Sequence, residues 1–209
     1  MVAATPHWIA QTPLLARSHS LAQAAHGSQR RVTDGRLFIE HVVEVATLLH
    51  AGGFDTELVA VGLLHDAVER GTLTEAELRR KVEDPIAALV MTLSEDPAID
   101  AFDERKARLR AQVRAAGGRA VTVFAADKLS DIVGLRRGLR RLGAAVEARM
   151  GTTIAAMAGH YQESVAMIEE ARPGSIFLPR LRLQLQRLSA DRIPEGGLYA
   201  EGSPSRAGS

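Results

Sequence analysis

A chain of 209 residues is long enough to bury one substantial core, and 46% of its residues are hydrophobic. Its 26 basic and 25 acidic residues nearly cancel, which excludes a strong overall field that would attract nucleic acid or an anionic membrane. The absence of cysteine excludes disulfides, thiol nucleophiles and thiolate metal ligands, and it leaves His, Asp and Glu as candidate ligands.

The sequence predicts an all-α fold, because apolar residues recur at helical spacing and Gly or Pro interrupts them at intervals. In chain order, helices are predicted over residues 14–25, 41–51, 56–69, 74–82, 84–94, 101–116, 119–142, 150–171 and 175–188. Asp55 is the expected N-cap of the third helix. Thr74 and Glu77 form a capping box for the fourth. No run approaches the roughly 20 apolar residues of a membrane span, so we expect no membrane partner and a cytoplasmic protein.

The helical pattern predicts one domain over residues 14–188. Residues 1–13 precede the first long predicted helix and are interpreted as an N-terminal extension. Residues 189–209 contain few large apolar residues and many Gly, Pro and Ser, a composition typical of a mobile tail. The oligomeric state stays open.

Three of the predicted helices carry polar residues on faces that are otherwise apolar. His41 lies on the apolar face of the second helix, and Asp127 follows the apolar turn VTVFAA of a later one. His65 and Asp66 are adjacent at the end of the apolar run GLL. Because buried imidazoles and carboxylates cost free energy when unpaired, this set is suited to a divalent metal such as Mn or Fe. Glu69, four residues after His65, is expected one turn further on, where it could activate a water.

Each of these residues also has a purely structural interpretation. A single inward histidine is more often a hydrogen-bonded core residue than a metal ligand, and Asp127 could accept a bond from Lys128. Lys128 could equally pair with Asp131 instead of contacting a substrate. The run GLRRGLRRLG has four arginines and no interleaved aromatic residue, which favours a solvated face or a partner contact over nucleic-acid binding.

The order His41, His65-Asp66, Asp127 resembles the H…HD…D pattern of the HD-domain phosphohydrolases. The surrounding text is more specifically similar to the hydrolase domain of the RelA/SpoT alarmone enzymes and to the small alarmone hydrolases, in the segments AAHGSQRR, FIEHVVEVATLL, AVGLLHDAVE, LTEAELRRKV and FAADKLSDIVGL. The resemblance implies an HD-domain helical bundle that holds one ion, Mn, between its helices through His41, His65, Asp66 and Asp127. It also implies removal of the 3′-pyrophosphate from the nucleotides ppGpp or pppGpp.

By the same resemblance, Glu69 matches the residue that activates the attacking water, and Arg31 or Arg30 matches an arginine beside the nucleotide base. Lys128 is a candidate for holding the phosphates that do not react. The expected partner is therefore a small-molecule nucleotide.

Two positions depart from the family pattern. Arg70 follows Glu69 where the alarmone hydrolases have a second acid, and Asp131 stands at the position of a substrate-contacting Asn. Asp131 would bring negative charge near a polyanionic substrate, and Arg70 is its expected partner. Two alternatives therefore stay open: hydrolysis of another nucleotide or phosphoester, and an HD protein that binds a nucleotide or a protein without turnover.

Overall fold

The structure is a computed structural model that describes residues 5–191, and the regular elements in that range are all helices, as predicted. In chain order they are α1 His7–Gln11, α2 Pro13–His26, α3 Phe38–Ala51, α4 Thr56–Leu64, α5 Glu75–Lys81, α6 Asp84–Leu93, α7 Phe102–Ala116, α8 Gly118–Leu142, α9 Val146–Met150, α10 Ile154–Ala171 and α11 Leu178–Asp191. The short 3-10 turn Gly143–Ala145 joins α8 to α9.

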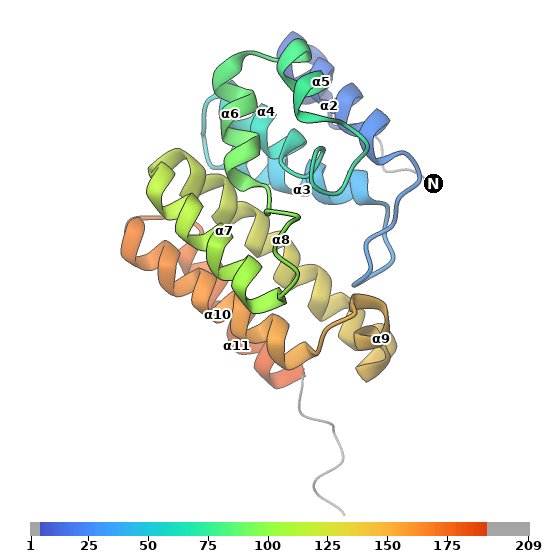
Figure 1. Cartoon of the computed structure of the whole chain (residues 1–209), viewed down its shortest axis with the longest axis vertical. Coiled ribbons are helices and arrows are strands. Elements are labelled where there is room, and N and C mark those ends of the chain that lie inside the picture. Colours follow the sequence, from blue (N-terminus) through green and yellow to red (C-terminus); the bar gives the residue numbers. More distant parts are fainter. Residues whose placement is uncertain (1–4, 192–209) are drawn as a thin grey trace, which may run out of the picture.

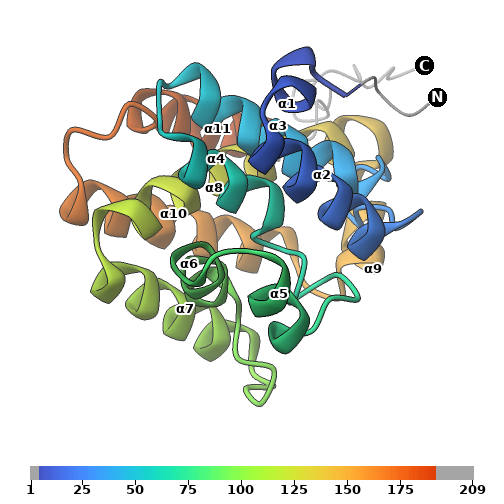
Figure 2. The same ribbon diagram turned by 90° about the horizontal axis from the view of Figure 1, so that it is seen from above.

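The helices pack in two groups that meet along α8. The helices α2 to α6 occupy the upper half of Figure 1, whereas α7, α8, α10 and α11 lie side by side in the lower half. Helix α8 contacts α3, α4 and α6 of the first group and α7, α10 and α11 of the second. Helix α1 lies beside α2 at the edge of the first group (Figure 2). This packing brings α3, the end of α4 and α8 together, which are the three segments predicted to carry the polar residues.

The core consists of the apolar faces of these helices. All residues of α4 from Leu58 to Leu64 are buried, as expected for a helix that is hydrophobic on every side and lies at the centre of a fold. On α8, Phe124, Leu129 and Ile132 are almost fully buried. Each such side chain contributes about 1.5–3 kcal/mol of favourable transfer free energy. The core therefore fixes the positions of α4 and α8, which carry polar residues of interest.

Helix α4 ends at Leu64, and the prediction of a helix as far as residue 69 was wrong. The backbone N–H of Ala67 donates to the carbonyl of Leu64, and the N–H of Arg70 donates to the carbonyl of Asp66. These bonds close tight turns instead of continuing the helix. The helical spacing that was expected to place Glu69 therefore does not apply, and the turns place this residue instead.

The predicted helix caps are confirmed. The Asp55 carboxylate accepts a hydrogen bond of 2.9 Å from the backbone N–H of Leu58. Thr74 and Glu77 exchange side-chain to backbone bonds in a capping box. Local sequence thus decides where α4 and α5 begin.

The two predicted limits of the domain lie near the two ends of the chain. Helix α1 lies within residues 1–13 and packs on α2 with Ile9 fully buried. The domain boundary at residue 14 stays a prediction, and residues 192–209 of the predicted tail lie outside the described residues. Within residues 5–191, no helix combines the length and hydropathy needed to cross a bilayer.

The arginines of the run from residue 134 to 143 do not form a uniformly solvated face. Arg136 is buried, and its Nε lies 2.6 Å from a carboxylate oxygen of Asp191. Arg137 approaches Glu44, with 3.4 Å between Nη2 and Oε1. At least two of the four arginines are therefore held by other helices of the protein.

Replacing Gly138 by Ala is expected to destabilise the protein by about 3 kcal/mol. A Cβ at this position of α8 would collide with the backbone carbonyl oxygen of Thr33, and the backbone cannot yield as a side chain can. The matched control is Gly159→Ala on α10, where a Cβ meets nothing within 4 Å. There the loss of glycine flexibility should stabilise the fold by about 0.5–1 kcal/mol. Urea unfolding of both variants measures the two changes, and equal stabilities would contradict the close approach of α8 to the Thr33 carbonyl.

Candidate metal centre

The structure brings His41, His65, Asp66 and Asp127 together between α3, the end of α4 and α8. The Nε2 atom of His41 lies 3.4 Å from Oδ2 of Asp66 and 3.3 Å from Oδ1 of Asp127. The Nε2 atom of His65 lies 3.3 Å and 3.4 Å from the same two oxygens. Two imidazole nitrogens and two carboxylate oxygens therefore converge on one point, and both histidines and Asp127 are buried.

This set fits a divalent metal. A tetrahedral or octahedral shell with bonds near 2.1 Å has ligand atoms about 3.0–3.4 Å apart, which matches the spacing of the four atoms. The Nδ1 atom of His65 lies 2.9 Å from the Gly62 carbonyl, which can only accept, so Nδ1 carries a proton. The Nε2 atom of His65 is buried and lacks a hydrogen-bond partner. An orphaned nitrogen that faces two carboxylates is the arrangement expected of a ligand.

The cluster is strongly polarised by its own charges. Burial opposes the charging of His65, but the carboxylates of Asp66 and Asp127 outweigh it and raise the pKa of this imidazole well above its usual value. Burial likewise opposes the ionisation of Asp127, but Lys128 and the two histidines hold the pKa of this carboxyl well below its usual range. The two histidines also hold the pKa of Asp66 well below its usual range, so both carboxylates are ionised and available to a cation.

Glu69 lies beside this cluster and is held from two sides. Its Oε2 accepts a hydrogen bond of 2.8 Å from the backbone N–H of Glu95, and its Oε1 lies 3.1 Å from Nη2 of Arg70. Burial and the neighbouring Asp66 carboxylate raise the pKa of Glu69. Arg70 also approaches Asp66, with 3.7 Å between Nε and Oδ1. Arg70, at the position where the resemblance to alarmone hydrolases leads us to expect a second acid, therefore contacts Glu69, the carboxylate that was expected to act as base.

Asp131 pairs with Arg31 and Lys128, so the expected pairing with Arg70 was wrong. Its Oδ1 lies 2.8 Å from Nη2 of Arg31, and its Oδ2 lies 2.9 Å from Nζ of Lys128. Lys128 also bridges to Asp127 at 2.8 Å. Arg31 reaches this position from the loop before α3 because Gly134 leaves room, since a Cβ there would lie 2.7 Å from the guanidinium. The negative charge of Asp131 is therefore neutralised inside the protein.

Arg30, the other candidate for the contact with the base, is not brought to this site. Its side chain is exposed, and its guanidinium donates to the carbonyl of Gly35 at 2.9 Å. Neighbouring residues in an extended loop point in opposite directions, so only one of the two arginines can face inward. That residue is Arg31.

A cavity of about 100 Å³ lies beside the cluster, and its lining includes His65, Asp66, Glu69, Asp127, Arg31 and Asp131. Pockets that enclose a whole drug-sized ligand are larger, about 300–1,000 Å³, so this one suits a phosphoryl group with the rest of the ligand outside. The sequence did not single out three further lining residues, Lys106, His160 and Tyr161. They come from α7 and α10 and carry no motif; only their inward helical positions could have indicated them. Burial lowers the pKa of His160, which keeps this ring neutral.

The fold and the cluster define an all-α protein with a buried His/Asp centre of the kind that holds a divalent cation. The sequence matches the HD domain family over residues 18–142, more than half of the chain. The protein belongs to the HD domain family.

The chain is also similar to individual proteins of known name. The chain is 30% identical over 141 residues to the GTP pyrophosphokinase rsh of Brucella ovis, covering 64% of this chain and 19% of the relative. It is 27% identical over 128 residues to the guanosine-3′,5′-bis(diphosphate) 3′-pyrophosphohydrolase of Aquifex aeolicus, covering 60% of this chain and 18% of the relative. The chain thus spans about a fifth of the length of these relatives.

A solved structure supports the fold. The structure described as a metazoan ortholog of SpoT that hydrolyzes ppGpp superposes with a TM-score of 0.66 and with 23% identity. The match covers 91% of this chain and 98% of that one. The likeness therefore extends over nearly the whole helical bundle.

Proposed function

We propose that the protein is a metal-dependent phosphohydrolase that removes the 3′-pyrophosphate from ppGpp or pppGpp. The observation that carries the proposal is the convergence of His41, His65, Asp66 and Asp127 on one point, with Glu69 in the cavity that the last three of them line. The names of the Brucella, Aquifex and metazoan relatives support guanosine phosphates as the substrate class. The products would be GDP or GTP and pyrophosphate, with a hydroxyl left on the 3′ carbon.

The four clustered residues would hold the cation, for which Mn is our proposal and Fe the other metal suited to these ligands. Once bound, such a cation supplies Lewis acidity, lowering the pKa of a water and stabilising negative charge on phosphoryl oxygens. Glu69 would accept the proton of the attacking water, and its raised pKa makes it a stronger base than an ordinary carboxylate. Arg70 follows Glu69 where a second acid was expected, and the nearby Glu95 carboxylate, which also lines the cavity, is paired with Arg105 and Lys106.

Charge in the cavity suits a polyanion only when the cation is present. With its two histidines counted as neutral, as a metal-binding imidazole must be, the cavity is lined by five carboxylates and four basic side chains, an excess of one formal negative charge. A divalent cation turns this into an excess of one positive charge. Lys128 would then hold the phosphates, and Arg31 would lie beside the base. Asp131 would orient both of these basic side chains. Because the cavity admits only a phosphoryl group, the nucleoside would lie at its rim near the exposed Val32.

Pyrophosphate release from ppGpp by the purified protein with added Mn²⁺ tests the proposal. We expect turnover that a chelator stops and that is absent from the Asp66→Ala variant run in parallel. Nucleotide products are separated by chromatography, so that GDP is distinguished from products of cleavage elsewhere. A panel of other nucleotides and phosphoesters is assayed in the same way. A metal-loaded wild type that leaves ppGpp intact but cleaves another compound would overturn the substrate and keep the chemistry.

A binding protein without turnover is the second candidate, and the contact between Arg70 and Glu69 favours it. A base whose oxygen is held by a guanidinium is a weaker proton acceptor. Binding of ppGpp at micromolar concentration with no product after prolonged incubation would support this candidate. In that case the Arg70→Asp variant, which restores a second acid, is the variant in which hydrolysis should appear.

A further inference from the structure

The metal-site histidine His41 is linked by two hydrogen bonds to a carboxylate on the outer side of α3. Its Nδ1 lies 2.9 Å from Oγ of Ser130 on α8. The hydroxyl of Ser130 donates to Oε2 of Glu44, also at 2.9 Å. His41 and Ser130 are both buried, with 2% and 1% of their surface exposed, whereas the Glu44 side chain is 30% exposed. A continuous chain of polar groups therefore runs from the surface to the metal centre.

The direction of these bonds follows from the number of protons available. A carboxylate can only accept, so the single hydroxyl proton of Ser130 points to Glu44. Oγ of Ser130 can then only accept from His41, which requires a proton on Nδ1. A neutral imidazole with its proton on Nδ1 has its lone pair on Nε2, the atom that faces Asp66 and Asp127.

We propose that Glu44 is a positioning residue that, through Ser130, fixes the proton of His41 on Nδ1 and so keeps Nε2 available to the cation. The assignment rests on the proposed role of His41 as a ligand. Metal-binding histidines commonly gain orientation and basicity from a carboxylate or carbonyl at their other nitrogen. His65 obtains this directly from the Gly62 carbonyl, whereas His41 obtains it through a serine.

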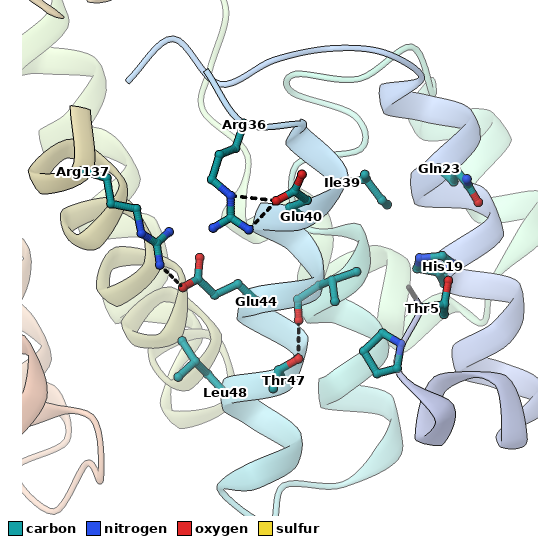
Figure 3. A pocket seen from close by; sticks show the side chains of 12 residues that line it. Thr5, His19, Gln23, Arg36, Ile39, Glu40, Glu44, Thr47, Leu48 and Arg137 are labelled. Atoms are coloured by element: carbon teal, nitrogen blue, oxygen red, sulfur yellow. Dashed lines mark hydrogen bonds and ion pairs between the residues drawn. The ribbon is translucent and has the colours of Figure 1, made fainter. Parts of the chain in front are cut away.

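Glu44 is itself held in place on the surface side. Its Oε1 lies 3.4 Å from Nη2 of Arg137, and the two side chains point toward one another from α3 and α8 in Figure 3. Both line a surface cavity of about 530 Å³ that also includes the ion pair of Arg36 with Glu40. The orientation of His41 thus depends on a residue that belongs to a different cavity from the reacting groups.

Loss of the Glu44 carboxylate reverses the chain of donors. In the Glu44→Ala variant, the Ser130 hydroxyl is free to turn and donate to Nδ1 of His41, which moves the imidazole proton to Nε2. We expect the affinity of the metal-stripped protein for Mn²⁺ to fall by about 10- to 100-fold. The Ser130→Ala variant should show a similar loss, and the double variant should show no further loss because both residues act through one path.

The matched control is Glu40→Ala, which removes a carboxylate one turn earlier on α3, in the same cavity and also paired with an arginine. Its Mn²⁺ affinity should equal that of the wild type. The second readout is the ¹⁵N spectrum of the histidine rings in the metal-stripped proteins. We expect a slowly exchanging proton on Nδ1 of His41 in the wild type and in Glu40→Ala, and its loss in Glu44→Ala and Ser130→Ala.

Three results would overturn the assignment: an unprotonated Nδ1 in the wild type, an unchanged spectrum in Glu44→Ala, or effects of Glu44→Ala and Ser130→Ala that multiply. A different set of results distinguishes failure of the Glu44 assignment from failure of the proposed function. If Nδ1 behaves as expected in all four proteins but the wild type neither binds Mn²⁺ nor hydrolyses ppGpp, the hydrogen-bond path stands and the proposed function fails.

Discussion

The Asp127→Asn variant is expected to lose its bound metal and to hydrolyse ppGpp at least about a thousandfold more slowly than the wild type, a loss of about 4 kcal/mol of transition-state stabilisation. Asn has the shape of Asp but offers a neutral oxygen, so the cluster loses one of its two negative charges. The Oδ1 atom of Asp127 is within 3.4 Å of both imidazoles, and no other carboxylate except Asp66 approaches them so closely among the described residues. Lys128 keeps a partner in Asp131, which limits the effect on folding.

The measurements for this variant are metal content after dialysis and kcat with Mn²⁺ restored. Asp103→Asn, an exposed carboxylate in the first turn of α7, is the control for a loss of charge elsewhere. Thermal unfolding checks that both variants fold. Retention of metal and of turnover by Asp127→Asn would rule out the cluster as the metal centre.

The Glu69→Gln variant is expected to bind Mn²⁺ with unchanged affinity and to lower kcat by about 10²- to 10⁴-fold, the usual contribution of a general base. Glu69 is not one of the four converging residues, so the metal centre stays intact. Gln can still accept the hydrogen bond from the backbone N–H of Glu95, which preserves the position of the side chain. The variant thus removes proton transfer with little change in shape.

Comparison of Glu69→Gln with Asp127→Asn separates the loss of the proton acceptor from the loss of the bound metal. The control is Glu75→Gln on the exposed surface of α5, which should leave kcat unchanged. Single-turnover kinetics with Mn²⁺-loaded protein measure the chemical step directly. An unchanged rate in Glu69→Gln would show that another group accepts the proton. Glu69 would then have no part in the reaction, and its contact with Arg70 would be purely structural.

The sequence by itself determined most of the helices, although α1 and α9 were not predicted, and it indicated the four residues of the His/Asp cluster. Helical periodicity and helix caps are local properties, so Asp55, Thr74 and Glu77 could be assigned to the starts of α4 and α5 without knowledge of the packing. The pattern of polar residues on apolar faces indicated His41 and Asp127, because a buried ionisable group must find a partner outside its own helix.

Only the tertiary structure decided how these residues are oriented. Asp131 pairs with Arg31, 100 residues earlier, and Ser130 bonds to Glu44, 86 residues earlier. The sequence of α8 does not reveal which side chains of such distant segments it will meet. The end of α4 at Leu64 was missed because the turns that follow are closed by backbone bonds, which leave little trace in the residue pattern. Arg31 and Arg30 were indistinguishable in the sequence, and the space beside Gly134 distinguishes them. Periodicity shows which face of a helix is buried, whereas the partners on that face depend on how separate helices meet.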